Sequence, residues 1–285
     1  MIGKGIKRKL IQLASFGFCN SHINGFAEGK IYDGKLKTLC CPGMNCYSCP
    51  AATLSCPVGA MQAVAGSRKF NFSFYVVGIL LAFGVMFGRA ICGYICPFGL
   101  IQELFAKIPL RKFHLPKWLT YLKYVLLAVF VVLLPVVMPL FSSASGGVGD
   151  PAFCKYICPV GTLEGSIPLM SSHEELRSVA GSLFILKASI LVITIIACIF
   201  IHRFFCKALC PLGAIYGLLN KISFLRLKID TKKCTSCGTC SHVCPMDVNP
   251  LKYPDSAECI RCGRCVDKCP EKAIHIGIKH TDRSS

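Results

Sequence analysis

The chain has 285 residues, of which 53% are hydrophobic and 16% are charged, with a mean hydropathy of +0.56. This composition is typical of a membrane protein and argues against a soluble one. The formal charge is +18 with every cysteine counted as neutral, and the basic residues lie mainly beside hydrophobic segments. We therefore expect the positive charge to orient the chain in a lipid bilayer, and we expect no nucleic-acid binding.

Three apolar segments are each close to the roughly 20 residues that a helix needs to cross the hydrocarbon core of a bilayer. They cover residues 70–88, 119–141 and 183–201. A fourth and weaker segment, residues 10–26, fits an interfacial helix as well as a span. The sequence therefore predicts a mainly α-helical, polytopic membrane domain over residues 1–221, with about four spans.

Basic residues predict the orientation of these spans, because short cytoplasmic loops carry an excess of lysine and arginine. Such residues dominate the loop after the first strong span and the segment after the third. The loop between the second and third carries only Lys155 and Arg177. We therefore expect a multi-pass protein of the cytoplasmic (inner) membrane with its C-terminal domain in the cytoplasm, although Lys30, Lys35, Lys37, Arg68 and Lys69 would then lie outside.

A motif of the form C-x3-C-P occurs three times near the ends of the apolar segments, each time with a glycine two residues after the proline. The copies are Cys92/Cys96, Cys154/Cys158 and Cys206/Cys210. Each copy supplies two thiolates, which is half of the ligand set of a [4Fe–4S] cluster. Because the first and third copies lie on the same predicted face, we expect Cys92, Cys96, Cys206 and Cys210 to hold one cluster.

The opposite face carries the Cys154/Cys158 pair and a second cysteine-rich segment. That segment contains Cys40, Cys41, Cys46, Cys49 and Cys56. Because Cys49, Cys56 and Pro57 look like a widened copy of the repeat, we expect a further [4Fe–4S] cluster on Cys49, Cys56, Cys154 and Cys158. The alternatives are a local cluster on Cys40, Cys46, Cys49 and Cys56, or disulfides on an outer face. Cys40, Cys41 and Cys46 could instead be reactive thiols or ligands of another group.

Residues 222–285 contain the most specific motif, C-x2-C-x2-C-x3-C-P, in two copies. The runs are Cys234, Cys237, Cys240 and Cys244, and, 25 residues later, Cys259, Cys262, Cys265 and Cys269. In this bacterial ferredoxin spacing the fourth cysteine of each run ligates the other cluster. We therefore expect a small α+β domain with one [4Fe–4S] cluster on Cys234, Cys237, Cys240 and Cys269 and a twin on Cys259, Cys262, Cys265 and Cys244. Zinc sites and disulfide frameworks fit this spacing poorly.

The sequence thus predicts three to four [4Fe–4S] clusters, with iron bound through the same cysteines. No G-x-G-x-x-G motif follows a strand, so no nicotinamide or flavin site is indicated. Quinone is compatible with the sequence, but no motif indicates it. Cys19 and Cys198 are single, and we expect Cys198 to be a packing residue within an apolar segment.

Apolar spans with C-x3-C-P motifs followed by a two-cluster ferredoxin resemble the NapH/CcoG/NosR group of membrane polyferredoxins. The resemblance is strongest to NapH-like proteins, covers roughly residues 1–280 and rests on Cys92/Cys96, Cys206/Cys210 and the eight ferredoxin cysteines. It implies four spans, both ends in the cytoplasm, and electron transfer between a membrane quinol pool and a periplasmic reductase system. The cysteines of residues 40–56 and Cys154/Cys158 depart from the NapH pattern. They favour an electron carrier that exchanges electrons with partners on both faces of the membrane.

We therefore expect an electron carrier or oxidoreductase subunit that relays electrons between a cytoplasmic ferredoxin domain and a membrane or outer-face partner. The alternatives are a quinol dehydrogenase subunit of a respiratory reductase system, a metal-reducing assembly factor similar to CcoG, and a redox sensor. The expected partners are the bilayer and protein redox partners. The hydrocarbon core is about 30 Å thick, which is too far for one efficient electron hop. Either the motifs dip into the membrane or another cofactor bridges the gap.

Overall fold

The computed structural model describes residues 4–66, 74–141, 151–178 and 180–278. The first part contains α1 (Lys4–Cys19), α2 (Gly25–Glu28), η1 (Lys35–Thr38), α3 (Pro57–Ala65), α4 (Phe74–Phe87), α5 (Ala90–Tyr94) and α6 (Pro97–Phe105). The middle part contains η2 (Lys117–Tyr121), α7 (Leu122–Leu126), η3 (Leu127–Leu133), α8 (Leu134–Phe141), η5 (Phe153–Ile157), α9 (Pro159–Gly161), η6 (Thr162–Ser166), α10 (Ile167–Ser172), α11 (Glu174–Ser178) and α12 (Ser182–Phe200). The last part contains α13 (Phe204–Ala208), α14 (Pro211–Leu219), β1 (Leu225–Ile229), α15 (Thr239–His242), α16 (Arg264–Asp267) and β2 (Ile274–Ile278).

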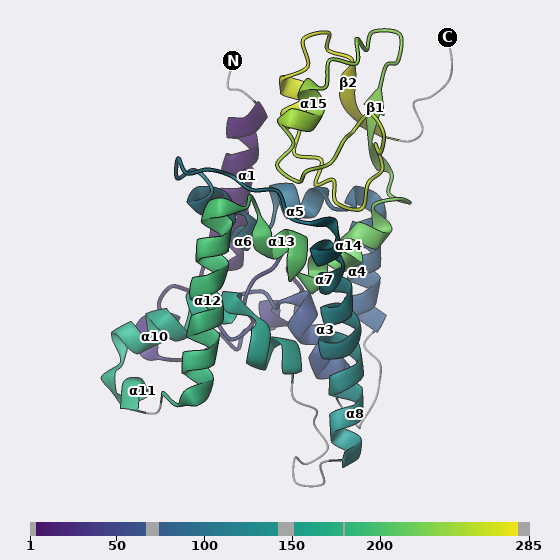
Figure 1. The fold of residues 1–285 in the computed structure, drawn as a ribbon. Coiled ribbons are helices and arrows are strands. Elements are labelled where there is room, and N and C mark those ends of the chain that lie inside the picture. Colours follow the sequence, from purple (N-terminus) through teal and green to yellow (C-terminus); the bar gives the residue numbers. More distant parts are fainter. Residues whose placement is uncertain (1–3, 67–73, 142–150, 179, 279–285) are drawn as a thin grey trace.

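The small C-terminal domain caps one end of the helical part (Figure 1). Its strands β1 and β2 are antiparallel, with Leu225 opposite Ile278 and Ile229 opposite Ile274. The N-terminal end of α1 lies on the same side of the molecule, whereas α8 and α12 extend toward the opposite end. The mainly helical fold with a C-terminal α+β domain agrees with the sequence prediction.

Within the part of the chain that the structure describes, two helical stretches are long and apolar enough to cross a membrane, Lys117–Met138 and Ser182–Phe200. They correspond to the second and third predicted spans. The first corresponds to the shorter helix α4, since residues 70–73 lie outside the described part of the chain. The weak segment, residues 10–26, does not form one helix, because α1 ends at Cys19. The prediction of four spans is therefore not confirmed.

The C-x3-C-P motifs share one local fold. The second cysteine is extended, with ψ of 116° at Cys96, 115° at Cys158 and 110° at Cys210, and the following proline begins a helix. Proline suits the first helical position because that position needs no N–H donor, and it disfavours a helical conformation in the residue before it. Cys56, with ψ of 127°, precedes α3 in the same way. Its motif therefore folds like the three shorter copies.

A buried ion-pair network joins three short helices to α1. Glu103 of α6 accepts bonds from Arg8 of α1 at 2.8 and 2.6 Å, and from Arg203, which precedes α13, at 3.0 and 2.7 Å. Arg8 also donates to the Gly93 carbonyl of α5 at 3.0 Å. Burial alone would raise the pKa of Glu103, but the two guanidinium groups hold this pKa at about 2. The carboxylate is therefore ionised at every pH at which the protein would be studied.

A second network holds the C-terminal domain against the helical part. Arg89 donates to Glu258 at 2.5 Å and to the Ala257 carbonyl at 2.8 Å, and Lys123 pairs with the same carboxylate. The Asn220 amide donates to the carbonyls of Ser256 and Cys259 at 2.7 and 3.1 Å. These bonds position the cysteine run that begins at Cys259 directly over α5 and α14.

Replacing Glu103 with glutamine should leave Arg8 and Arg203 buried without a counter-charge. Removing one partner from a buried ion pair costs about 3–5 kcal/mol, so the melting temperature in detergent should fall markedly. The exposed Glu174→Gln change on α11 serves as the matched control and should leave it unchanged. Since the pKa of Glu103 lies near 2, the difference between the two variants should be constant from pH 5 to 8. Equal melting temperatures would contradict the network.

Candidate iron–sulfur sites

The two ferredoxin-type runs interleave as their spacing predicts. Cys234, Cys237, Cys240 and Cys269 line one small cavity. Cys259, Cys262, Cys265 and Cys244 line another. In each cavity three cysteines come from one run and the fourth comes from the other run. Both sets have the donor chemistry that a [4Fe–4S] cluster needs.

The backbone of the two runs also repeats in detail. Ser236 and Arg261, which each precede the second cysteine of a run, have φ of 55° and 49°. Asp247 and Lys272, three residues after the last cysteine, also have φ of 55° and 49°. Left-handed conformations of non-glycine residues are costly and persist where the surroundings demand them, often around a ligand. Their recurrence at matching positions indicates that both runs wrap around similar groups.

The inner set contains Cys92, Cys96, Cys206 and Cys210, which are all buried. A reciprocal pair of arginines joins its two halves. Arg89 donates to the Cys206 carbonyl at 2.6 Å, and Arg203 donates to the Cys92 carbonyl at 2.6 Å. Each arginine precedes the first cysteine of its own motif by three residues but binds the first cysteine of the other. The structure therefore brings together the two motifs that topology paired in the sequence.

Burial opposes ionisation of these thiols. It raises the pKa of Cys92 to about 11, although Arg89 and Arg203 act in the opposite direction. Cluster ligands must be thiolates, so iron binding has to release these protons. The two guanidinium groups and the hydrogen bonds to sulfur are the parts of this chain that stabilise the negative charge. The Gln102 amide donates to Cys206 Sγ at 3.1 Å, and the Gly213 N–H donates to Cys210 Sγ at 3.3 Å.

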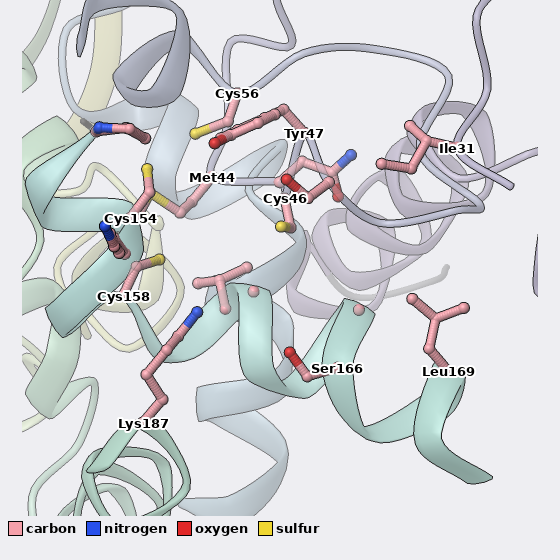
Figure 2. A pocket seen from close by; sticks show the side chains of 17 residues that line it. Ile31, Met44, Cys46, Tyr47, Cys56, Cys154, Cys158, Ser166, Leu169 and Lys187 are labelled. Carbon is pink, nitrogen blue, oxygen red and sulfur yellow. The ribbon is translucent and has the colours of Figure 1, made fainter. Parts of the chain in front are cut away.

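The outer set lines a cavity of about 460 Å³. Its cysteines are Cys46, Cys56, Cys154 and Cys158, which Figure 2 shows around one space. Cys49, which the sequence analysis placed in this set, is not among the lining residues, and its thiol donates to the Glu164 carbonyl at 3.0 Å. Cys40 is buried in the common core and is not among the lining residues either. The arrangement that pairs the two segments thus recurs in the structure, with Cys46 in the place expected for Cys49.

A polar residue that the motif spacing did not predict recurs six positions after the second cysteine of each repeat. These residues are Gln62, Gln102, Glu164 and Tyr216. Gln62 donates to Cys154 Sγ at 3.2 Å and accepts from the Phe153 N–H at 2.8 Å. Gln102 likewise donates to Cys206 Sγ at 3.1 Å and accepts from the Cys206 N–H at 3.4 Å, which supports similar packing in the inner and outer sets. Aligning the four repeats by their cysteine–proline pairs would have revealed this position.

Glu164 and Tyr216 contact the chain segment between the inner and outer sets. Glu164 Oε2 accepts from the Cys46 N–H at 3.0 Å. The Tyr216 hydroxyl donates to the Pro42 carbonyl at 2.9 Å. Burial raises the pKa of Glu164 to about 8. Residues 42–46 are therefore fixed at both ends by side chains that belong to the repeats.

Within the described residues, no group of three or more histidine, cysteine or acidic side chains converges tightly enough to hold a single metal ion. A [4Fe–4S] cluster distributes its four ligands over four different irons, so its thiolates need not converge on one point. The cysteine sets fit a cluster in number and in donor chemistry.

Two family models match the chain. One describes a 4Fe-4S binding domain and matches residues 70–116, 125–166 and 183–232. The other describes a 4Fe-4S dicluster domain and matches residues 226–270. Together they include the three C-x3-C-P motifs and both ferredoxin runs.

Named relatives give the same result. The ferredoxin-type protein NapH of Haemophilus influenzae is 28% identical over 67% of this chain and 60% of its own length. The methylamine utilization ferredoxin-type protein MauN of Methylorubrum extorquens is 29% identical over 58% of this chain and 50% of its own. The chain belongs to the NapH-like family of 4Fe–4S polyferredoxins. This confirms the resemblance and the [4Fe–4S] class of cofactor.

The match to these relatives is partial in length. An uncharacterized protein of Methanocaldococcus jannaschii is 27% identical over 60% of this chain and 64% of its own length. The chain thus covers less than two thirds of each of the three relatives. No solved structure matches the chain significantly.

Replacing Gln102 with leucine removes one hydrogen bond to the Cys206 sulfur. Hydrogen bonds to cluster sulfur stabilise the more negative, reduced state. We therefore expect the potential of the inner cluster to fall by roughly 60 mV, which equals about 1.4 kcal/mol for one electron. Gln62→Leu is the matched control and should instead lower the potential of the outer cluster. EPR-monitored redox titration measures both shifts, and an unchanged potential in both variants would contradict the sulfur bonds.

Proposed function

We propose that this protein relays electrons through four [4Fe–4S] clusters, from the C-terminal domain to the outer cysteine set or in reverse. The ligands are the two ferredoxin-type sets, the inner set, and an outer set in which Cys46 replaces Cys49. The single observation that carries the proposal is the sequence of direct contacts between these sets. The protein resides in the cytoplasmic membrane as a multi-pass protein with the C-terminal domain in the cytoplasm. The two long apolar helices and the basic residues near that domain support this orientation.

The first contact joins the C-terminal domain to the inner set. A Cβ atom at Gly93 would lie 2.8 Å from the Ile260 carbonyl oxygen, so only glycine permits this approach. Gly93 follows Cys92 of the inner set, and Ile260 follows Cys259 of the neighbouring cluster. One backbone contact therefore separates a ligand of one cluster from a ligand of the next.

The second contact joins the inner and outer sets. A Cβ atom at Gly43 would lie 2.9 Å from the Cys96 Cα atom. The next residue, Met44, lines the outer cavity. Residues 43–46 thus lead from a ligand of the inner cluster to Cys46 of the outer one. The two sets also share one continuous hydrophobic core, so electrons need not cross the full hydrocarbon thickness in one hop.

Iron content tests the cluster assignment. The anaerobically purified protein should contain about 16 iron atoms per chain, four for each cluster. Cys46→Ser should reduce this to about 12, whereas Cys49→Ser should leave it unchanged. The opposite result would restore Cys49 as the ligand. About 12 iron atoms in the unmodified protein would mean that the outer set holds no cluster.

Electron transfer across a bilayer tests the function. The protein is inserted into liposomes that enclose cytochrome c, and dithionite, which does not cross the bilayer, is added outside. We expect reduction of the enclosed cytochrome c by the unmodified protein and by the control Cys198→Ser, and at least a tenfold slower reduction with Cys154→Ser. Equal rates with Cys154→Ser, or no reduction by fully loaded protein, would contradict the relay.

A quinol-oxidising role is a second candidate, because one apolar cavity suits a quinone ring. It has a volume of about 570 Å³ and lies between α1, α5 and the C-terminal domain. Tyr94, Arg261 and His275 supply polar groups to otherwise mainly apolar walls. Reduction of the oxidised clusters by a short-chain quinol, abolished by Tyr94→Phe together with His275→Leu, would support this role.

A further inference from the structure

Two cysteines that belong to none of the four sets lie against each other. The Sγ atoms of Cys19 and Cys41 are 3.0 Å apart, and both residues are buried. A disulfide bond is about 2.05 Å long, so a sulfur movement of ~1 Å separates the pair from a covalent bond. Cys19 ends α1 and Cys41 lies in the cysteine-rich segment, 22 residues further along the chain. The fold has therefore brought two distant thiols together.

The backbone holds both cysteines in place from one short segment. The Thr53 N–H donates to the Cys19 carbonyl at 3.0 Å, and the Cys41 N–H donates to the Ser55 carbonyl at 2.9 Å. Leu54, between these two anchors, packs against both cysteines. The pair is thus covered by an apolar side chain and fixed on both sides. These restraints keep the two sulfurs together in the reduced state as well as in the oxidised one.

The pair also lies next to the contact between the inner and outer sets. Cys41 precedes Pro42, whose carbonyl receives the Tyr216 hydroxyl at 2.9 Å. Gly43 then approaches Cys96 of the inner set, where a Cβ atom would lie 2.9 Å from the Cys96 Cα atom. The Cys41 sulfur therefore lies only a few covalent bonds from the segment of residues 43–46, through which electrons would pass between the inner and outer sets.

We propose that Cys19 and Cys41 form a redox-active dithiol–disulfide couple that exchanges two electrons with the neighbouring clusters. The proposal rests on the proposed function, since the clusters supply and accept the electrons. On reduction the S–S bond breaks, two electrons enter in single steps from two reduced clusters, and two protons are taken up, which gives two thiols. On oxidation the S–S bond forms, the two electrons return to oxidised clusters and two protons leave. Ser15 is half-buried and lies one turn before Cys19 on α1, so its hydroxyl is placed to relay these protons.

Such a couple gives a chain of one-electron carriers a place to store an electron pair. Each [4Fe–4S] cluster passes single electrons, whereas a disulfide accepts two. The couple could thus match the clusters to a partner that reacts with two electrons at a time. This role differs from that of a structural disulfide, which would remain oxidised whatever the state of the clusters.

The test determines the state of the pair at two cluster potentials. The full-length protein is poised anaerobically with its clusters oxidised or photochemically reduced, then quenched in acid, denatured and alkylated. Mass spectrometry should find Cys19 linked to Cys41 in the oxidised sample and both alkylated in the reduced sample. Cys96→Ser should slow this reduction at least tenfold, because the inner cluster is lost. A pair that has the same state in both samples would overturn the proposal.

Control variants separate the couple from the clusters. Cys41→Ala should keep the iron content and the EPR signals of the unmodified protein but take up two fewer electrons per chain in coulometric titration. Cys198→Ser, another buried cysteine, whose thiol faces Gln102 at 3.8 Å, should take up the full number. Equal uptake by Cys41→Ala would overturn the couple. Loss of iron from the unmodified protein would instead indicate failure of the proposed function.

Discussion

The reciprocal bonds from Arg89 and Arg203 to the carbonyl of the opposite cysteine motif hold the structure around its centre. Both guanidinium groups are buried, so each needs a carboxylate partner. Arg203 finds Glu103, which also holds α1 through Arg8. Arg89 finds Glu258, which docks the C-terminal domain. Arg89 and Arg203, which join the two halves of the inner set, therefore also attach α1 and the C-terminal domain to that set.

The segment of residues 42–46 connects the inner and outer cysteine sets. It lies between the inner and outer sets, where Tyr216 and Glu164 hold its ends. Both sets consequently share one hydrophobic core. The sequence left two ways to shorten the electron path, either cysteine motifs that lie close together or a further cofactor between them. The shared core supports motifs that lie close together.

The sequence predicted the parts of the molecule that are specified by local spacing. The grouping of the ferredoxin cysteines, the proximity of Cys92/Cys96 to Cys206/Cys210 and the helical fold all follow from short motifs and apolar length, whereas the assignment of these cysteines to individual clusters stays a prediction. The choice between Cys46 and Cys49 does not, because spacing cannot show which thiol turns into the cavity and which one donates to the Glu164 carbonyl. The contact between Cys19 and Cys41 depends on how α1 packs against residues 53–55, and no local pattern encodes it. Whether residues 10–26 form a span or an interfacial helix was ambiguous for the same reason, because the position of α1 depends on the tertiary hydrogen bonds of Arg8.

Magnetic coupling tests most directly whether the inner and outer clusters lie next to each other. EPR spectra of the fully reduced protein are compared with those of Cys154→Ser, which retains the inner set. We predict that the inner cluster signal is broadened and relaxes quickly in the unmodified protein, and that it sharpens and relaxes more slowly in the variant. A variant spectrum that lacks one signal but leaves the line width and relaxation of the inner cluster unchanged would contradict adjacent clusters.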